Sequence, residues 1–271
     1  MTILIKRSAA LACLVLFATP VARGQSWEAS LSPFVPGSFA EPRPLRARYN
    51  FGWSGFTAAT ADFRLEKLSD DRFQLEAHGG TVGLARTLWK YDIRHTALSD
   101  AKTLRPLSVQ EDEKLRSKEV ATALTYSPTG VSSAREEWQD GAVKSKNRRL
   151  DFPDVLSVNS ALLFLRTQPL TDKAAYRVVV YPATSAYLCT VTVIGRERLA
   201  VASGKPEAIK LDVQLSKIGD KRELTPHKKF RNATVWLSND ADRLVLRVEA
   251  QVYVGQVFAE LQSVQFDNPK P

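Results

Sequence analysis

The amino-acid sequence predicts an all-β protein, a single antiparallel β-barrel or curved half-barrel with one packed α-helix. Apolar and polar residues alternate with a period of two along most of the 271 residues, as half-buried strands require. Turn residues interrupt this alternation at intervals of roughly eight to fourteen residues, a spacing typical of barrels and sandwiches. A single segment replaces the alternation by a helical period. These three observations define the fold class.

The first residues have the features of an export signal. Lys6 and Arg7 precede an apolar run at 9–18, and small residues follow up to Gly24. This arrangement is typical of a secretory signal peptide cleaved after Gly24. The run is too short to span a bilayer, and no later stretch has the eighteen consecutive apolar residues of a transmembrane helix. We therefore expect residues 1–24 to be a signal peptide, and the mature chain to be periplasmic or secreted, without a transmembrane anchor.

The net charge of the chain indicates which classes of binding partner are favoured. It holds 38 basic and 29 acidic residues, a formal charge of +9, which falls to +6 when Lys6, Arg7 and Arg23 are removed by export. A moderate excess spread along the chain indicates a mixed, solvated surface and disfavours nucleic acid. Lipid, lipopolysaccharide or an acidic glycan stays open as a partner. The best local candidate is the basic run at 144–149, which is otherwise the exposed face of a strand.

The mature chain keeps one cysteine, Cys189, and so can form no intrachain disulfide. Its own core must hold the domain together, which its length permits. Leu188 and Val191 flank this cysteine, so we interpret it as a small buried core residue and not as a nucleophile.

The predicted elements run from a Pro-rich extended lead-in at 25–44 through one β-rich domain at 45–266 to a C-terminal tail at 267–271. Before the helical segment we expect a short helix at 82–88 and strands at 45–53, 56–67, 72–78, 89–98, 106–113, 118–126, 131–138 and 143–151. After it we expect strands at 175–181, 186–195, 197–202, 206–217, 232–238, 243–254 and 256–266. The first strand shows the pattern best, with apolar residues at Leu45, Ala47, Tyr49, Phe51 and Trp53.

The main helix is predicted from Asp154 to Arg166. Its apolar residues recur at helical spacing, at Val155, Val158, Leu162 and Leu165. Asp154 is the expected N-cap and Pro169 ends the continuation. We expect this helix to lie across one opening of the barrel or against one face of the sheet.

Several segments carry a family resemblance. They are the opening Tyr49-Asn-Phe-Gly-Trp-Ser-Gly-Phe56, the helix from Asp154-Val-Leu-Ser157 to Leu163-Phe-Leu-Arg166 with Pro169-Leu170, the turn Gly195-Arg-Glu197, and the end Val235-Trp-Leu-Ser-Asn-Asp240 followed by Val254-Gly255. Together they resemble the bacterial domain-of-unknown-function family 3108 over about residues 45–266. The resemblance implies an exported β-rich protein, and it carries no catalytic signature. At the penultimate strand the chain departs from the expected pattern, with Val245, Leu246 and Arg247 where a proline is expected nearby.

No catalytic or metal motif stands out. The three histidines, His78, His95 and His227, lie in separate segments without ligand spacing, so we expect neither a metal nor a cofactor. No nucleophile elbow occurs, although a triad assembled from distant residues stays open. The acidic cluster Glu111, Asp112 and Glu113 is typical of a solvated strand, because neighbouring residues point to opposite faces.

Aromatic residues supply the ligand-binding candidates. Trp53, Trp89, Trp138 and Trp236 lie on different predicted strands, where they either fill the core or line a cavity for an acyl chain or a sugar. Arg247 and Glu249, on the polar side of a strand, are candidates for a polar handle in that cavity or for surface charges.

The leading functional hypothesis is an exported, non-catalytic binding or carrier module for an amphiphile or a cell-envelope component. Two alternatives stay open, a hydrolase of envelope polymers and a structural partner of an envelope assembly. An internal apolar cavity favours the carrier, and converging carboxylates or a Ser-His pair favour the hydrolase. A flat apolar patch or an open strand edge favours the structural partner.

Overall fold

The computed structural model describes residues 26–39, 42–202, 204–227, 232–252 and 255–267. The expected signal peptide and its cleavage site after Gly24 lie outside these residues, as does the tail from residue 268 onward. The described chain divides into a short unit up to Ser30 and a main unit from Leu31. The short unit holds a 3-10 helix, Trp27–Ser30 (η1), in which the Ser30 hydroxyl donates to the Trp27 carbonyl.

The main unit is built around one antiparallel sheet of 15 strands. The strands before the main helix are β1 Leu45–Trp53, β2 Phe56–Lys67, β3 Arg72–Thr81, β4 Tyr91–Asp100, β5 Pro106–Leu115, β6 Lys118–Ser127, β7 Gly130–Gln139 and β8 Ala142–Asp151. Those after it are β9 Ala175–Val180, β10 Tyr187–Arg198, β11 Glu207–Ile218, β12 Leu224–Pro226, β13 Ala233–Ser238, β14 Val245–Gln251 and β15 Gln256–Phe266. Two α-helices accompany them, α1 Gly83–Leu88 and α2 Val158–Thr167.

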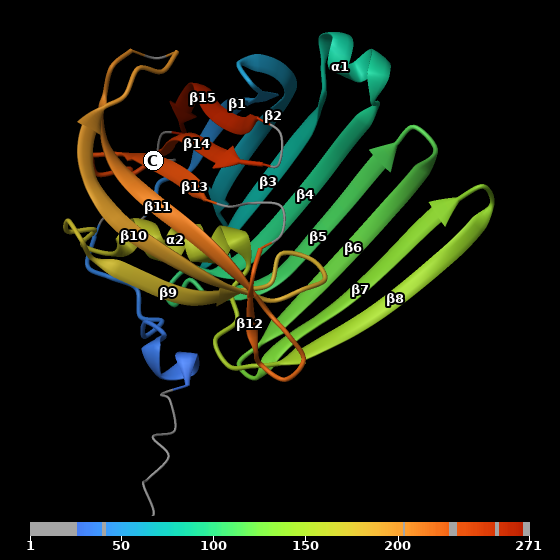
Figure 1. Cartoon of the computed structure of the whole chain (residues 1–271), viewed down its shortest axis with the longest axis horizontal. Coiled ribbons are helices and arrows are strands. Elements are labelled where there is room, and N and C mark those ends of the chain that lie inside the picture. The colour runs from blue at the N-terminus through green and yellow to red at the C-terminus, as the bar shows by residue number, and fades with distance from the viewer. Residues whose placement is uncertain (1–25, 40–41, 203, 228–231, 253–254, 268–271) are drawn as a thin grey trace, which may run out of the picture. The chain divides into compact units, whose positions relative to one another are not determined.

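The strand order shows how the sheet is assembled. It runs β8-β7-β6-β5-β4-β3-β2-β1-β15-β14-β13-β11-β10-β9, with β12 paired beside β11. The first eight strands are a meander, and pairing of β1 with β15 joins the two ends of the chain in the middle of the sheet. The sheet is curved and stays open between the edge strands β8 and β9 (Figure 1). The predicted fold class is therefore confirmed in its half-barrel form.

Several predicted boundaries were wrong. The separate strand expected at 197–202 does not form, because β10 continues through a register shift between Val193 and Gly195 to Arg198. The strand expected at 243–254 is shorter, Val245–Gln251, and residues 253–254 lie outside the described chain. The predicted strand at 89–98 begins two residues later, at Tyr91, since Trp89 caps α1.

The N-cap of α2 is Ser157 and not Asp154. The Ser157 hydroxyl accepts a hydrogen bond from the Ser160 backbone N–H at 3.0 Å, a typical N-cap interaction. Asp154 has a positive φ of 55° and pairs with Arg105 at 2.5 Å. Leu156 forms a parallel bridge to Val180, so the backbone before Ser157 is extended and the helix begins later than its apolar spacing suggests.

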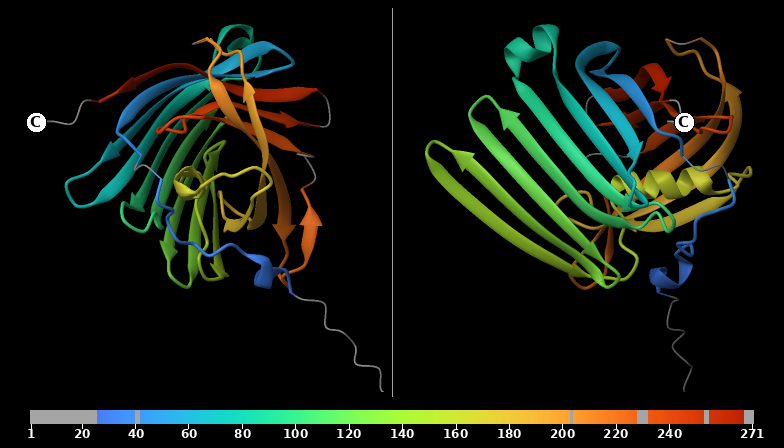
Figure 2. Two further views of the ribbon diagram at one scale, coloured as in Figure 1. Left: turned by 90° about the vertical axis from the view of Figure 1, so that its left-hand side faces the viewer. Right: turned by 180° about the vertical axis from the view of Figure 1, so that it is seen from behind.

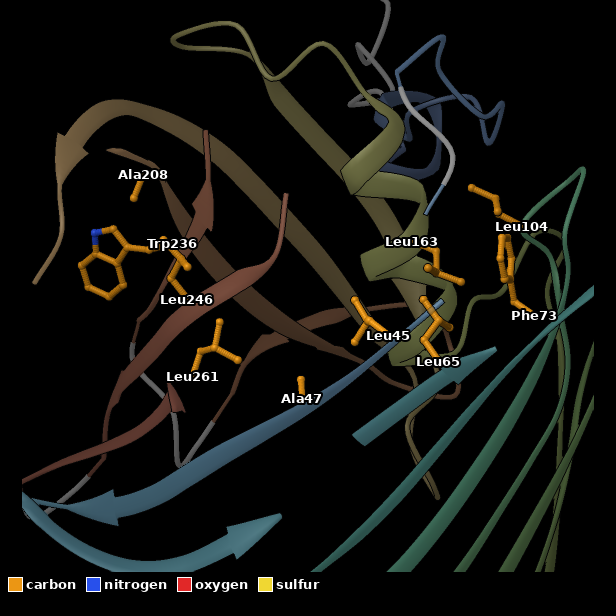
Figure 3. Packing of buried hydrophobic residues seen from close by; sticks show 10 residues of the cluster. All are labelled: Leu45, Ala47, Leu65, Phe73, Leu104, Leu163, Ala208, Trp236, Leu246 and Leu261. Atoms are coloured by element: carbon orange, nitrogen blue, oxygen red, sulfur yellow. The ribbon is translucent and has the colours of Figure 1, made fainter. Parts of the chain in front are cut away.

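Helix α2 lies on the inner face of the curved sheet (Figure 2), which we define as the face that carries Ser99, whose hydroxyl meets that of Ser160 at 2.9 Å. Leu163 of α2 is 1% exposed and belongs to a core cluster with Leu45, Leu65 and Phe73, close to the helix in Figure 3. A second cluster joins Leu165 to apolar residues of β10, β11 and β13. The helix therefore fills the inner face beside these strands.

The C-terminal end of α2 is clamped by two arginines. Arg243, 4% exposed, donates to the carbonyls of Arg166 at 2.8 Å, of Gln168, and of Pro169 at 3.3 Å. Arg166 in turn donates to the Asp242 carbonyl at 2.6 Å. The last carbonyls of a helix lack partners inside it, and a cation there also suits the helix dipole.

The turn before Arg243 is held by its own side chains. Asp240 accepts hydrogen bonds from the Ser238 hydroxyl at 2.7 Å and from the Arg243 backbone N–H at 3.0 Å. The Ser-Asn-Asp segment that carries the family resemblance thus positions the arginine that clamps α2. This part of the pattern has a structural role.

The lead-in runs along α2. The Ser32 backbone N–H donates to the Arg177 carbonyl at 2.9 Å, beside the edge of β9, and the ring of Phe34 lies 5.0 Å from that of Phe164. At Gly37 an added Cβ would lie 2.1 Å from the Thr167 carbonyl oxygen, so no other residue fits there without a shift of the chain. This segment covers one sheet edge, which sheets otherwise leave exposed to pairing.

Candidate functional site: a groove on the outer face

The candidate site is a groove across the outer face of β3–β7, the face away from α2. Its volume is about 570 Å³, within the range of about 300–1,000 Å³ typical of ligand sites. Residues of five neighbouring strands line it, most of them facing outward: His78, Gly79, Asp92, Ile93, Arg94, Asp112, Glu113, Lys114, Glu119, Val120, Ala121 and Trp138. Because consecutive strand residues alternate between faces, Trp138, Glu119 and Ala121 mark it as a site on the outer face.

Strand register places polar side chains in rows across the groove. One row joins His78 to Arg94 and Arg94 to Asp112 as direct cross-strand partners. The next row runs from Asp92 through Lys114 and Glu119 to Trp138. Both rows cross rigid strands, so the groove presents its side chains from fixed positions.

The two rows differ in how their polar groups are engaged. Lys114 pairs with Glu119 at 3.2 Å, and Asp92 pairs with Arg86 at 2.7 Å. This hydrogen bond to Arg86 lowers the pKa of the Asp92 carboxyl. In contrast, no side-chain hydrogen bond or ion pair connects His78, Arg94 or Asp112 to any other described residue. Donors and acceptors of that first row are therefore available to a ligand.

Small residues keep the groove hollow. An added Cβ at Gly80 would lie 2.5 Å from Asp92 Oδ1, so glycine lets the carboxylate lie across β3. Ala121, beside Asp112 on the neighbouring strand, adds only a methyl group to the lining. The absence of bulk at these positions leaves the polar row accessible from the outside.

Trp138 stands at one end of the groove. It lies on β7 two residues before Asp140 of the Asp140-Gly141 turn, where both residues adopt positive φ angles of 51° and 78° as a tight hairpin requires. The side chain is 39% exposed. It also lines a second hollow of about 320 Å³ at the turns of the β5–β6 and β7–β8 hairpins. A half-exposed indole in the same groove as the row His78, Arg94 and Asp112 is a platform on which a sugar ring can stack.

The other predicted site residues lie elsewhere. Trp53 is 47% exposed at the end of β1, and Trp89 is 56% exposed after α1, where it stacks on Tyr91 with 5.2 Å between ring centroids. Trp236 is 6% exposed in the core, and its indole N–H donates to Glu197 at 2.6 Å. The four tryptophans thus do not line one cavity.

Arg247 and Glu249 lie close to Trp236. Arg247 is the direct cross-strand partner of Trp236, and its guanidinium pairs with Glu249 at 2.6 Å and with Glu260 at 3.2 Å. The structure therefore brings these three predicted residues together on adjoining strands, where both charged groups already have partners within the chain.

The inner face of β4–β7 carries a second polar cluster. His95 Nδ1 lies 3.1 Å from Glu111, and the Tyr91 hydroxyl donates to Glu113 at 2.9 Å, which Arg135 approaches to 3.7 Å. Glu111 and Glu113 point to the same face because they are two residues apart on β5, whereas Asp112 between them points to the other face. Both carboxylates are partnered, and the cluster contains no serine or cysteine nucleophile.

Sequence reasoning missed His78, Arg94 and Asp112 as a site. Each lies on a different strand, and only the register aligns them. Their signal in the sequence is weak, since a polar residue on the outer side of a strand is ordinary. The described residues contain no group of three or more side chains suited to hold a metal. Within the same residues, no helix has the length and apolar character needed to cross a membrane.

Comparisons with known proteins identify the family. The model of DUF3108, described as a protein of unknown function, matches residues 48–262. The chain therefore belongs to the DUF3108 family, as its sequence motifs indicated. No match was found among curated proteins.

Solved structures support the fold. The chain is similar to a β-barrel-like protein of the DUF1849 family from Brucella abortus, with a TM-score of 0.55, 11% identity, and coverage of 84% of this chain and 99% of that one. An alignment with a protein from Bacteroides fragilis, assigned as exported and with a YmcC-like fold, has a TM-score of 0.36 and 8% identity over 84% of this chain and 99% of that one. The latter score is too low to establish a shared fold.

Proposed function

We propose that this member of the DUF3108 family is an exported, non-catalytic module that binds a saccharide component of the cell envelope in the outer groove. The observation that carries the proposal is that Trp138 lines the same groove as the row His78, Arg94 and Asp112. Stacking on an aromatic ring combined with hydrogen bonds from charged side chains is the chemistry that recognises sugar rings and hydroxyls. Export is supported by the signal-peptide features of residues 1–24.

The groove suits a polar ligand better than an acyl chain. Its lining alternates acids with bases, as at Arg94 and Asp112, and an acyl chain would leave these charges without water or partners. On the inner face, α2 and its core clusters occupy the place where an apolar cavity for a carrier would form. An amphiphile held inside the barrel therefore has less support than a saccharide held outside it.

The alternative function, a structural partner that pairs with another protein through an open strand edge, has little support at the edge strand β8. Strand β8 is exposed along almost its whole length and carries four basic residues between 144 and 149. Lysine-rich exposed edges are a common way to prevent pairing with another chain. The strand edge that such a partner would extend is therefore protected by charge.

Binding of defined sugars tests the proposal. N-acetylglucosamine oligomers and a lipopolysaccharide core oligosaccharide are titrated into the purified exported protein, and binding is followed by calorimetry. We expect Trp138→Ala to weaken binding at least tenfold, and Arg94→Ala to weaken it further in the double variant. Trp53→Ala is the matched control, since Trp53 is similarly exposed and does not line the groove.

Two results would contradict the proposal. One is the absence of binding to every oligosaccharide tested, and the other is an equal effect of Trp53→Ala and Trp138→Ala. Release of reducing ends during the titration would instead favour the hydrolase alternative.

A further inference from the structure

Helix α1 presents an apolar surface that no described residue of the main unit covers. Its six residues include no buried side chain. Leu84 is 85% exposed and Leu88 is 81% exposed. The two leucines are four residues apart and so lie on the same side of the helix. Trp89, 56% exposed, follows directly. A helix normally buries its apolar side against its own protein, and α1 does the reverse.

The exposed leucines are held in place by surrounding contacts. Arg86 forms two hydrogen bonds to Asp92, at 2.7 and 3.1 Å. The Thr81 hydroxyl donates to the Trp89 carbonyl at 2.9 Å. From the next hairpin, Arg116 donates to the Thr87 carbonyl at 2.7 Å, one of the carbonyls that the end of a helix leaves without a partner. The leucines are thus displayed by an anchored element.

Other apolar side chains gather at the same end of the meander. In an antiparallel meander, alternate connections lie at one end of the strands, and this end holds the turns after β1, β3, β5 and β7. Phe56, 76% exposed, follows the β1–β2 turn, and Val143, 55% exposed, follows the β7–β8 turn. Figure 1 shows α1 and the β5–β6 and β7–β8 turns along one rim of the sheet. We call α1 with Trp89, Phe56 and Val143 the apolar rim.

Cations accompany the apolar rim. Lys90 and Arg116 are exposed, and Arg86 is partly exposed beside them. Between residues 82 and 90 the chain has two basic residues and no acidic one. Leucine and tryptophan next to lysine and arginine are the combination that binds the headgroup region of an anionic bilayer. These positive charges favour an anionic lipid surface as the binding partner of the rim. A protein surface with few acidic residues would not complement them.

We propose that the apolar rim docks on an anionic lipid surface, with Leu84 and Leu88 inserted among the lipids and Lys90 and Arg116 facing the headgroups. This inference stands apart from the proposed saccharide site, because neither leucine lines the groove. Docking would hold the outer face of β3–β7 close to the membrane that carries envelope saccharides.

Vesicle flotation tests the inference. The exported protein, with its mature N-terminus checked by sequencing so that the apolar run at 9–18 does not contribute, is mixed with vesicles of phosphatidylglycerol and phosphatidylcholine. We expect the native protein to float with anionic vesicles and the double variant Leu84→Ser, Leu88→Ser to bind at least tenfold less. Lys90→Glu should weaken binding to anionic vesicles in particular, and raised salt should weaken it further.

Ile194→Ser is the matched control. Ile194 is 55% exposed on β10, outside the apolar rim, so its replacement should leave flotation unchanged. Circular dichroism and thermal melting of the double variant should match the native protein, because both leucines are exposed. The inference would be overturned if the native protein did not float, or if Ile194→Ser reduced flotation as much as the double variant does. Binding of a purified envelope protein without flotation would also overturn it, and would indicate that the rim contacts protein. If a variant lost saccharide binding but still floated with the vesicles, the proposed saccharide site would be affected and the lipid-docking inference would be supported.

Discussion

The sheet has two halves whose inner faces are satisfied in different ways. Beside α2, the inner face is apolar and closed by Leu163 and Leu165. Toward β8, the same face holds buried apolar residues such as Val120 and Leu124, and it adds polar contacts between neighbouring strands. His95 lies beside Glu111, and the Tyr91 hydroxyl donates to Glu113. Apolar burial contributes about 1.5–3 kcal/mol per large side chain, whereas a cross-strand pair contributes about 0.2–1 kcal/mol. We therefore expect the α2 half to contribute more to stability, while the open half carries the groove and the apolar rim.

The two sheet edges repeat this contrast. The lead-in covers the edge of β9 through Ser32 and Arg177. The edge of β8 has no such cover among the described residues and is instead rich in lysine and arginine. One edge is protected by packing and the other by charge, which suits a half that must stay open to solvent.

The clamp on α2 offers the largest test of this comparison. Arg243→Ala removes a buried guanidinium that serves three carbonyls and stacks on the Phe39 ring at 3.2 Å. We expect a loss of roughly 3 to 5 kcal/mol in the free energy of unfolding, since charged hydrogen bonds contribute about 1.5–3 kcal/mol and the carbonyls would stay buried. Urea denaturation measures it.

Arg149→Ala is the matched control for this prediction. Its guanidinium pairs with Asp151 on the surface of β8, with 65% of the side chain exposed, so a change of about 0 to 1 kcal/mol is expected. Comparable losses in the two variants would show that the clamp does not stabilise the α2 half.

Core packing gives the next largest effect. Leu163→Ala in α2 should cost about 2 to 5 kcal/mol, because the residue is 1% exposed and leaves a cavity between the helix and the sheet. Ile93→Ala, on the inner face of the open half and only partly buried, should cost clearly less. Equal destabilisation of the two variants in thermal melting would abolish the distinction between the halves.

The thiol of Cys189 probes the packing beside α2. Burial raises the pKa of the Cys189 thiol to about 12, so the native protein at pH 8 should react with a thiol reagent about a thousandfold more slowly than the unfolded chain. A raised pKa stabilises the fold fully below pH 9, and this contribution is lost as pH rises toward 12. Cys189→Ala should therefore melt with less dependence on pH in that range. Rapid labelling of the native protein would show that this region opens.

The smallest effect is expected in the polar cluster of the open half. Glu113→Gln keeps the shape of the side chain and removes the charge that meets Tyr91 and Arg135. We expect at most about 1 kcal/mol, because partly exposed pairs contribute little. A loss of several kcal/mol in chemical denaturation would mean that the polar face stabilises the sheet as strongly as α2 does.

The sequence by itself determined the strands, the main helix and the family. Period-two alternation located most strands within a few residues, and the apolar spacing located α2. The spacing did not give the buried side of α2 correctly, because Val158 is 60% exposed and the core contacts come from Leu163, Phe164 and Leu165. These patterns are local, because they depend on which side of a single element meets the core. Gly52 and Gly55, quoted for the family resemblance, also have local reasons. Gly55 has a φ of 88° at the β1–β2 turn. At Gly52 an added Cβ would lie 2.1 Å from the Phe56 carbonyl oxygen, and the ring of Phe258 on β15 closes the site further.

Only the tertiary structure decided the helix start and the candidate site. Ser157 replaced Asp154 as N-cap because Leu156 bridges to a distant strand. The tryptophans that looked equivalent in the sequence separated into the core residue Trp236 and the surface residues Trp53, Trp89 and Trp138. The row His78, Arg94 and Asp112 exists because register fixes which residues of three strands face one another. The alternation of apolar and polar residues shows which face of the sheet a side chain occupies. Hydrogen bonding between strands decides which side chains lie next to it, and a binding site depends on those neighbours.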